Sequence, residues 1–524
     1  MTELALLLMV AAAGHGLSRW SGVPVIPILL GLGMALSFTG MVKHPDLAAG
    51  AEMREDPLFF VLELGLTVLV FASGVELNPR RFRRQRRSVL WVGIVQFAAM
   101  GAVGFAGGRL LGFVPLEAAY LGFAVSASST VVGLRQLQLS QQSFEPHGRM
   151  VVGVLLLQDA LTMGVLIALA HAGSGIAGLA EGYGWAALMA GVAWVLQRGV
   201  AWWIIERFKS DEESMLLGAL MLLFVFLGAA YAAGLPLIIG AFLAGYSLSN
   251  FPVNGLVGGL LHSLVDFFRA VFFVALGALV TVPGAGMVVS AAVLALLVLV
   301  ITPPLVAAVA EWSGFTGRRA IESGLLLAQT SEFSLVLGLV GMRLGHLSGE
   351  TFSVVALMAV ATMTCTPLLA RDSVARWLLR LHPLRQRKHP PSLDREGHVL
   401  LLGLGSAGMY VVDPLRAAGV PLLVVDDDPA VILKLDREGV PCLRGDGGDE
   451  EVLERAGASK ARLVVASMHR VSDAMEVLDR VSGVPVLVRV FEEADAEAVR
   501  RRGGIPVSSA EAAAEEFMKW IEAK

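Results

Sequence analysis

Cysteine and charge are scarce in this sequence, and each scarcity excludes a class of protein. The 524-residue chain has two cysteines, Cys365 and Cys442, too few and too far apart for a disulfide framework or a paired-cysteine metal site. Charged residues make up 16% of the chain, whereas hydrophobic residues make up 55%. Soluble proteins carry about 25% charged residues, so this composition excludes a soluble enzyme and indicates a polytopic α-helical membrane protein.

The few charges are unevenly distributed along the chain. They are sparse up to residue 370 and frequent afterwards, although the formal net charge is only −4. This difference predicts a membrane domain over residues 1–370, a basic linker over 371–395 and a soluble domain over 396–524. The first apolar segment contains Glu3 and no preceding basic residue, so we expect a retained helix rather than a cleaved signal.

Apolar segments long enough to span a bilayer, about 20 residues each, recur through the first domain. We expect thirteen transmembrane helices, the first and ninth of them short, at residues 2–18, 22–40, 57–77, 88–112, 115–137, 148–171, 184–200, 213–233, 235–250, 259–281, 286–311, 319–344 and 349–370. Basic residues gather after the third, seventh and eleventh segments, most densely at Arg80–Arg87. By the positive-inside rule these connections are cytoplasmic, the N-terminus is outside and the C-terminus is inside. The arginines are therefore interpreted as a topology signal rather than a nucleic-acid site.

Ionisable residues are rare within these segments and therefore informative. Asp159 follows Gln158 near the middle of the sixth segment. An ionised carboxylate costs several kcal/mol at that depth, so we expect a functional site there. The alternative is a hidden basic partner that neutralises Asp159, and Arg269 is the basic residue to examine. Glu63, in the third segment, is expected to be a structural partner rather than an ion ligand.

The fifth and twelfth segments each contain a hydroxyl-rich interruption, at Ser126–Thr130 and at Gln329–Glu332. These interruptions occupy corresponding places if segments one to six and eight to thirteen are inverted repeats around a linking seventh. Interrupted helices in corresponding places expose carbonyls and helix ends that coordinate cations. The candidate ion ligands here are Ser128, Ser129 and Thr130, with Gln329 and Glu332 in support. Alternatively, the hydroxyls only bond back to their own helices, and we expect Glu332 to hydrogen-bond at the crossover rather than carry substrate.

The soluble domain contains a dinucleotide-binding motif in its expected context. The residues Gly403–Gly408 match GxGxxG, follow the apolar run His398–Leu404 and precede a helix-like stretch. About twenty residues further on, a second strand-like run ends at Asp426. Continued alternation of strands and helices predicts a doubly wound parallel sheet, an α/β Rossmann domain. The candidate cofactor-binding residues are Gly403, Gly405, Ser406, Gly408, Asp426, Asp427, Gly445 and Asp446.

A Rossmann scaffold that has lost its ligand is the alternative for this domain, because a fold does not fix a function. Neither a hydride-transfer site nor a substrate domain accompanies the motif, so we do not expect an enzyme.

In this order, these motifs resemble the Kef-type monovalent cation:proton antiporters. The resemblance rests on Glu63–Leu77, Ser128–Val132, Pro146–Asp159, Gly240–Leu248, Phe272–Gly277 and Gln329–Phe333, followed by the nucleotide-binding domain. It implies a homodimer with a dimerisation domain and a mobile core in which the fifth and twelfth segments cross. It also implies that Asp159 carries the ion and the proton, that the location is the bacterial inner membrane, and that the soluble part is a regulatory domain of RCK N or TrkA-N type. Asn250–Asp266 contains a single acid, whereas glutathione-gated relatives are more acidic there, and this departure argues against glutathione control.

The expected function is exchange of a monovalent cation, with K⁺ as the first choice, for H⁺. Asp159 holds either a proton or a metal cation, because a second charge in an apolar site is costly, and the neutral Gln158 favours one-for-one exchange. The expected regulatory ligand is an adenine nucleotide: AMP, ATP or NAD(H). The expected partners are the cation, the proton, membrane lipid and a second copy of the chain. The alternatives are a nucleotide-gated potassium channel, although the sequence has no TVGYG-type filter, and a nucleotide sensor that transports nothing.

Overall fold

The computed structural model describes most of the chain. The described residues are 2–21, 23–38, 57–77, 85–143, 145–171, 173–207, 212–250, 253–280, 284–380, 396–468 and 470–508, together with Ala514 and Met518. The chain divides into two compact units: Met1–Ser313 with Ile321–Ala375, and Gly314–Ala320 with Arg376–Lys524. Residues 80–84 of the predicted arginine-rich connection and residues 381–395 of the predicted linker lie outside the described residues.

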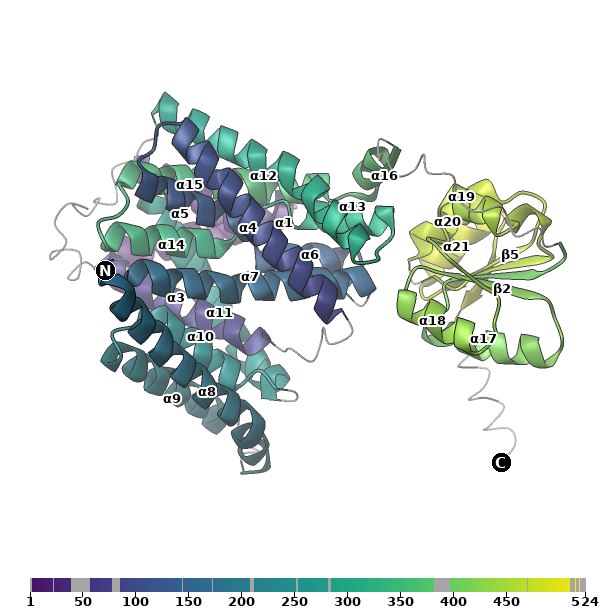
Figure 1. Cartoon of the computed structure of the whole chain (residues 1–524), viewed down its shortest axis with the longest axis horizontal. Coiled ribbons are helices and arrows are strands. Elements are labelled where there is room, and N and C mark those ends of the chain that lie inside the picture. The colour runs from purple at the N-terminus through teal and green to yellow at the C-terminus, as the bar shows by residue number, and fades with distance from the viewer. Residues whose placement is uncertain are drawn as a thin grey trace. The chain divides into compact units, whose positions relative to one another are not determined.

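The first unit is built from helices wherever it is described (Figure 1). The helices up to residue 380 are α1 (Thr2–Ser21), α2 (Val25–Phe38), α3 (Pro57–Glu76), α4 (Arg86–Leu110), α5 (Pro115–Ser126), α6 (Thr130–Leu139), α7 (Pro146–Ala170), α8 (Gly175–Arg207), α9 (Glu212–Ala232), α10 (Leu237–Ser247), α11 (Val253–Ala278), α12 (Ala285–Trp312), α13 (Gly317–Leu326), α14 (Glu332–Arg343), α15 (Gly349–Leu369) and α16 (Asp372–Arg380). Of these, α13 and α16 each have residues in both units. Seven of the described helices, α4, α7, α8, α9, α11, α12 and α15, have the length and hydropathy of a membrane span, and α2 and α10 are shorter apolar helices. The structure therefore shows a membrane-protein fold, while the number of thirteen spans stays a prediction.

Three helix boundaries differ from the predictions. α1 has 20 residues and is not short, α8 begins at Gly175 rather than at residue 184, and α11 begins at Val253, where a loop was expected. In each case the helix extends beyond the apolar run into more polar sequence, because backbone hydrogen bonding does not stop where hydropathy falls. Arg19 in the last turn of α1 also suits the negative end of a helix.

The helices of the first unit pack as two groups. One group contains α1, α2, α3, α8, α9, α10 and α11, and the other contains α4, α5, α6, α7, α12, α14 and α15. Figure 1 shows α8, α9 and α10 on one side of this unit and α4, α12 and α15 on the other. Glycines permit the closest crossings: a Cβ on Gly74 of α3 would lie 2.2 Å from the carbonyl oxygen of Phe242 in α10. A larger residue there would force α3 and α10 apart.

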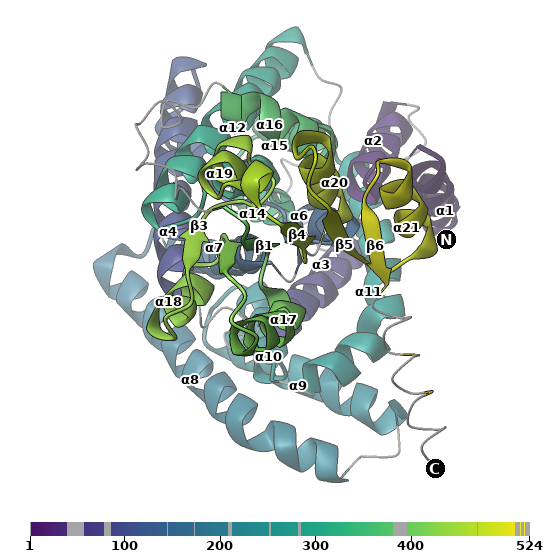
Figure 2. The same cartoon turned by 90° about the vertical axis from the view of Figure 1, so that its right-hand side faces the viewer.

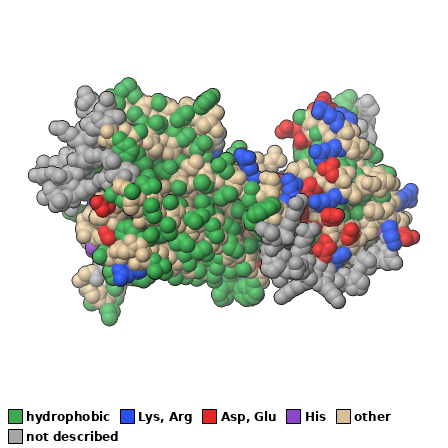
Figure 3. Space-filling model, turned by 90° about the horizontal axis from the view of Figure 1, so that it is seen from above, with side chains coloured by type: hydrophobic (Ala, Val, Ile, Leu, Met, Phe, Trp, Pro, Cys, Tyr) green, Lys and Arg blue, Asp and Glu red, His purple; other side chains and the backbone are tan. Residues whose placement is uncertain are grey.

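Large apolar side chains remain exposed on the outside of this unit. Examples are Trp91 on α4, Leu188 on α8, Phe224 on α9 and Val289 on α12. Figure 3 shows an almost continuous apolar covering on the visible face of the first unit, whereas acidic and basic side chains are frequent on the second. An apolar surface of this extent requires lipid around it, as the composition predicts.

The second unit contains a six-stranded parallel sheet in the order β3-β2-β1-β4-β5-β6 (Figure 2). The strands are β1 (Val399–Leu402), β2 (Leu422–Asp426), β3 (Cys442–Arg444), β4 (Leu463–Ala466), β5 (Val486–Val490) and β6 (Ile505–Ser508). The helices are α17 (Gly405–Ala417), α18 (Pro429–Arg437), α19 (Glu450–Arg455), α20 (Val471–Arg480) and α21 (Glu493–Arg501). Alternate residues of β1 face two separate apolar cores, Leu400 and Leu402 in one, Val399 and Leu401 in the other. This doubly wound α/β domain confirms the predicted strand and helix alternation.

Candidate ion and nucleotide sites

Two helices of the first unit are interrupted where the sequence predicts. The first break, Ala127–Ser129, separates α5 from α6, and the second, Leu327–Ser331, separates α13 from α14. The hydroxyl of Ser129 accepts the backbone N–H of Val132 at 3.3 Å at the start of α6, and Ser331 caps α14 in a similar way at 3.1 Å. These caps stabilise helix ends in the middle of the unit, where a continuous helix would leave no backbone group available.

Hydrogen bonds hold the two breaks against each other. Ser128 Oγ donates to the carbonyl oxygen of Leu327 at 2.7 Å, and Gln329 Nε2 donates to the carbonyl oxygen of Ser129 at 3.2 Å. The crossing that the resemblance implies is therefore present. In the described contacts, the partially negative carbonyl ends of α5 and α13 are met by hydroxyl and amide donors and not by a basic side chain.

Asp159 and Gln158 lie on α7 beside this crossing and are fully buried, each with 0% of its surface exposed. Thr130 Oγ1 donates to Asp159 Oδ2 at 2.9 Å. The backbone N–H of Ser128 donates to Gln158 Oε1 at 3.0 Å. The structure thus brings four of the predicted ion-site residues together, and Ser129 joins them through its backbone carbonyl.

A hidden basic partner for Asp159 is not found in the part of the chain that the structure describes. Arg269, the residue to examine, donates to Asp266 Oδ1 at 2.7 Å instead. Several buried oxygen atoms at the crossing have no hydrogen-bond partner among the described residues: Asp159 Oδ1, Gln96 Oε1, Gln329 Oε1 and Glu332 Oε2. Burying such acceptors without a partner is costly, and protein oxygens of this kind replace the hydration shell of a monovalent cation.

Three polar residues at the crossing are not predicted from the sequence. Gln96 of α4 donates through Nε2 to Ser128 Oγ at 3.0 Å. Thr362 and Thr366, one turn apart on α15, reach the second break: Thr362 Oγ1 accepts the backbone N–H of Thr330 at 3.2 Å, and Thr366 Oγ1 donates to Ala328 O at 2.8 Å. The available signal was a polar side chain inside an otherwise apolar segment, repeated at helical spacing on α15.

A cavity of about 530 Å³ lies beside the crossing, lined by α1, α2, α3, α6, α11 and α14. Thr130 and Glu332 are part of its wall, and Arg19 and Glu76 line it from the last turns of α1 and α3. The cavity therefore extends from the middle of the unit towards the end at which α1 and α3 terminate. Thr130 both lines the cavity and donates to Asp159, so this residue connects the cavity wall with the buried carboxylate.

Glu63 pairs with Arg343 at the start of α3 and the end of α14. The two guanidinium nitrogens lie 3.1 and 3.2 Å from the two carboxylate oxygens, so the contact is bidentate. Glu63 lies in the first half of α3 and does not line the cavity, whereas the last turn of α3 does, so the pair is away from the cavity along this helix. It joins one helix from each of the two packing groups.

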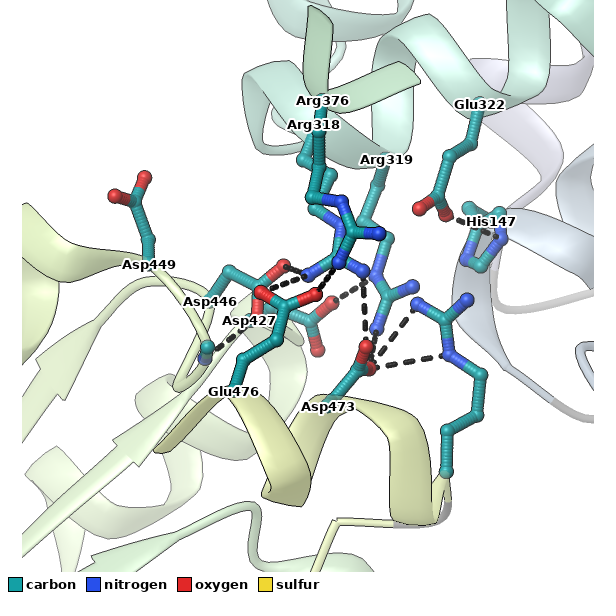
Figure 4. A network of polar contacts seen from close by, with 12 residues as sticks. His147, Arg318, Arg319, Glu322, Arg376, Asp427, Asp446, Asp449, Asp473 and Glu476 are labelled. Atoms are coloured by element: carbon teal, nitrogen blue, oxygen red, sulfur yellow. Dashed lines mark hydrogen bonds and ion pairs between the residues drawn. The ribbon is translucent and has the colours of Figure 1, made fainter. Parts of the chain in front are cut away.

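A buried histidine connects the start of α7 with α13 (Figure 4). His147 Nδ1 lies 3.3 Å from Glu145 Oε2, and its Nε2 lies 3.6 Å from Glu322 Oε2. Gln142 Oε1 is 3.4 Å from the same Nε2. This contact ties the helix that carries Asp159 to one of the interrupted helices.

In the second unit, the glycine motif forms the turn between β1 and α17. Gly403 has a φ of 77°, a conformation that favours glycine, and a Cβ there would lie 3.1 Å from the Met468 side chain. Asp426 ends β2 at the same edge of the sheet, and its carboxylate accepts the backbone N–H groups of Leu404 at 2.7 Å and Asp428 at 2.8 Å. Burial raises the pKa of Asp426 from 3.8 to about 6, against the effect of the Leu404 N–H.

The other candidates at this edge have ionic or backbone contacts. Asp446 Oδ1 accepts the N–H of Gly448 at 3.0 Å, and its Oδ2 lies 3.3 Å from Nη1 of Arg318, which belongs to the same unit (Figure 4). Asp427 pairs with Arg319 at 3.2 Å, and burial raises the pKa of Asp427 although Arg319 opposes the shift. Gly445 directly precedes Asp446, whereas the side-chain surroundings of Gly405, Ser406 and Gly408 lie outside the described residues.

Comparison with known proteins adds to this geometry. The family model for the transmembrane sodium/hydrogen exchanger matches residues 4–371, and that for the TrkA-N domain matches residues 399–519. The glutathione-regulated potassium-efflux system protein KefC of Enterobacter sp. (strain 638) is 28% identical over 464 residues, 84% of this chain and 72% of that protein. The chloroplastic K(+) efflux antiporter 1 of Arabidopsis thaliana is 28% identical over 431 residues, 78% of this chain and 36% of that protein.

One solved structure extends the comparison to the fold of the first unit. The sodium proton antiporter MjNhaP1 from Methanocaldococcus jannaschii matches with a TM-score of 0.53 at 16% sequence identity, over 72% of this chain and 97% of that chain. The likeness shows a shared antiporter fold. These relatives are transporters and not enzymes, and the resemblance to Kef-type antiporters is confirmed.

Proposed function

This chain belongs to the sodium/hydrogen exchanger family, and from that premise we propose that it exchanges K⁺ for H⁺ at the crossing of its two interrupted helices. The observation that carries the proposal is the buried carboxylate of Asp159, which has one hydroxyl donor, a second oxygen without a partner, and no basic neighbour among its described contacts. A buried carboxylate in that setting requires a mobile positive charge, either a proton or a metal cation.

Asp159 binds the two substrates, the cation and the proton, in turn. When the proton is bound, the site is neutral; when it leaves, a dehydrated cation takes its place and is held by Asp159 Oδ1 and neighbouring oxygens of the crossing. Gln158 contributes a neutral amide whose oxygen is already held by Ser128. A single carboxylate in the binding site supports exchange of one cation for one proton. The cation ligands proposed around it are Ser128, Ser129 and Thr130, with Gln329 in support.

In an alternating-access mechanism, the ion site is open to one side of the membrane at a time. By the positive-inside rule, the arginines that follow α3 place the end of α3 in the cytoplasm and the N-terminus outside. The cavity beside Thr130 then opens to the cytoplasm, and the Glu63–Arg343 pair closes the outer side. We therefore assign the structure to an inward-facing state. Movement of one packing group of helices against the other would reverse the two openings.

Each of the three parts of the chain has a proposed role, and the whole chain has a proposed assembly. We propose that residues 1–370 transport, that residues 371–395 form a basic linker on the cytoplasmic side of a bacterial inner membrane, and that residues 396–524 bind a regulatory adenine nucleotide. AMP, ATP and NAD(H) are the candidates, held by the turn at Gly403 and by the carboxylate of Asp426 accepting a ribose hydroxyl. The functional form is proposed to be a homodimer in lipid.

Proton flux in liposomes tests the ion site. The full-length protein is reconstituted with a pH-sensitive dye, and K⁺, Na⁺ or Rb⁺ is added at several pH values. We expect saturable proton release with K⁺ for the native chain and none for Asp159→Asn. The matched control is Glu117→Gln, which removes a carboxylate bound to Thr351 Oγ1 at 2.7 Å, away from the crossing. Undiminished exchange by Asp159→Asn would refute the assignment.

The same preparation separates the proposal from its alternatives. A channel gives a K⁺ current that does not require protons and does not saturate at the K⁺ concentrations that saturate an antiporter. A sensor that does not transport gives no ion flux. Nucleotide binding is measured as a thermal shift of the full-length protein with AMP, ATP, NAD⁺ or NADH. A shift that Asp426→Ala removes supports the nucleotide site, whereas no shift with any of these ligands supports a scaffold without a ligand.

A further inference from the structure

We propose that Glu332 is a second cation-binding residue, which takes the ion from the cavity before it reaches Asp159. The sequence alone predicts only a supporting hydrogen-bonding role for this residue. The inference rests on the proposed function, since it assigns the approach to the same ion site. Glu332 lines the cavity from the first turn of α14, whereas Asp159 is buried and accepts a hydrogen bond from Thr130.

The carboxylate of Glu332 faces the first break and the first turn of α6. The hydroxyl of Ser129 and the backbone N–H of Val131 both interact favourably with its ionised form. Its Oε2 atom is buried and has no hydrogen-bond partner among the described residues. The residue therefore presents a fixed carboxylate with one unsatisfied oxygen at the wall of a water-accessible space, and this is the geometry of a cation ligand.

Consecutive residues connect this carboxylate with the buried one. Ser129 interacts with Glu332, and the next residue, Thr130, donates to Asp159 Oδ2 at 2.9 Å. A cation leaving Glu332 thus passes two neighbouring hydroxyl groups to reach Asp159 Oδ1, which also lacks a partner. Replacing water molecules one at a time along such a path lowers the cost of dehydrating the ion.

The charges that face Glu332 leave room for a mobile cation. Arg269 of α11 acts on Glu332 electrostatically, but its guanidinium is hydrogen-bonded to Asp266 at 2.7 Å, and no ion pair between Arg269 and Glu332 is present in the described contacts. A competing role for Glu332 is neutralisation of the positive helix ends at the starts of α6 and α14. That role predicts lower stability in a neutral variant, with no change in the affinity for cations.

Kinetics of cation-driven proton flux test the proposal. For Glu332→Gln in liposomes of the full-length protein, we expect the KM for K⁺ to rise about tenfold or more, the loss expected for one charge-assisted contact, with kcat changed far less. The control is Glu117→Gln, which removes a carboxylate that accepts the Thr351 hydroxyl and does not line the cavity, and this variant should leave KM within about twofold.

The outcomes separate this inference from the proposed function. Absence of exchange by the native chain overturns the proposed function itself. Exchange by the native chain with an unchanged KM in Glu332→Gln, or an equal rise in Glu117→Gln, overturns only the role of Glu332. If Glu332→Gln does not fold, Glu332→Asp is used in detergent, where we expect K⁺ binding to raise the Tm of the native protein. A smaller K⁺-induced shift with Glu332→Asp supports the proposal, and an equal shift contradicts it.

Discussion

Asp159 in the first unit and Asp426 in the second are both buried carboxylates, but the two units satisfy them differently. Both oxygens of Asp426 accept backbone N–H groups, from Leu404 and Asp428. Asp159 has a single hydroxyl donor, Thr130, and an oxygen without a partner in the described part of the chain. Fixed donors hold a carboxylate permanently in place, whereas a missing donor leaves a position that an exchangeable ion can fill. The difference distinguishes a residue that positions a ligand from one that carries an ion.

The side chains around the buried acids also differ between the two units. In the second unit, Arg318 and Arg319 form ion pairs with Asp446 and Asp427 at 3.3 and 3.2 Å. At the helix crossing, the described donors are serine, threonine and glutamine side chains and backbone N–H groups. A resident arginine would compete permanently with a transported cation for Asp159. Neutral donors can orient the carboxylate without occupying it.

The largest effect is expected from removing the one donor to Asp159. Thr130→Val deletes the hydroxyl but keeps the volume, and hydrogen bonds to charged groups contribute about 1.5–3 kcal/mol, so K⁺-driven proton flux should fall by about 10- to 100-fold. Thr130→Ser retains the hydroxyl and should keep most of the activity. Thr364→Val is the control, because Thr364 only bonds back to Val360 O at 2.6 Å on α15. Near-native flux in Thr130→Val would mean that Asp159 does not depend on this donor.

The next effect concerns the carboxylate whose donors are fixed. Asp426→Asn replaces an acceptor oxygen with a donor, which conflicts with the Leu404 N–H and with an incoming ribose hydroxyl. We expect nucleotide affinity to fall by about tenfold or more, measured by calorimetry, without loss of ion exchange in nucleotide-free liposomes. Asp413→Asn, at an exposed position on α17, is the control. Equal weakening in both variants would show that general charge, and not this contact, binds the nucleotide.

A smaller, pH-dependent effect follows from the pKa of Asp426, which burial raises to about 6. If the ionised carboxylate accepts the ribose hydroxyl, affinity should fall as the pH is lowered through 6, by about tenfold one unit below the pKa. Stability without nucleotide has the opposite sign, because the folded state binds this proton more tightly than the unfolded state. The contribution is fully present below pH 3.8 and is lost as the pH rises through about 6. Calorimetry from pH 4 to 8 measures the nucleotide affinity, and thermal unfolding over the same range measures the stability. Asp426→Asn should remove the pH dependence of each.

The two sites also differ in how far the sequence predicts them. The sequence predicts the glycine turn and the acid that ends β2, because both are encoded locally, at Gly403 and Asp426, while their role in nucleotide binding stays a prediction. The helix breaks were predicted too, since hydroxyl-rich interruptions such as Ser128–Thr130 stand out in apolar segments. The contacts around the breaks were not predicted. Gln96 is a lone polar residue without periodicity, so its approach to the first break depends on tertiary packing alone.

The smallest effect is expected at the Glu63–Arg343 pair, whose partners are 280 residues apart in sequence and about a third exposed. Exposed ion pairs contribute about 0–1 kcal/mol, so Glu63→Gln should change the exchange rate by no more than about fivefold. If the pair closes the outer side, Arg343→Gln should have the same effect, and the double variant should add nothing further. Glu350→Gln, an exposed acid on α15, is the control. Additive losses in the double variant would show that the two residues act separately. A loss in Glu63→Gln as complete as that expected for Asp159→Asn would place Glu63 in the ion path. That result would contradict the contrast between permanently paired and exchangeable carboxylates.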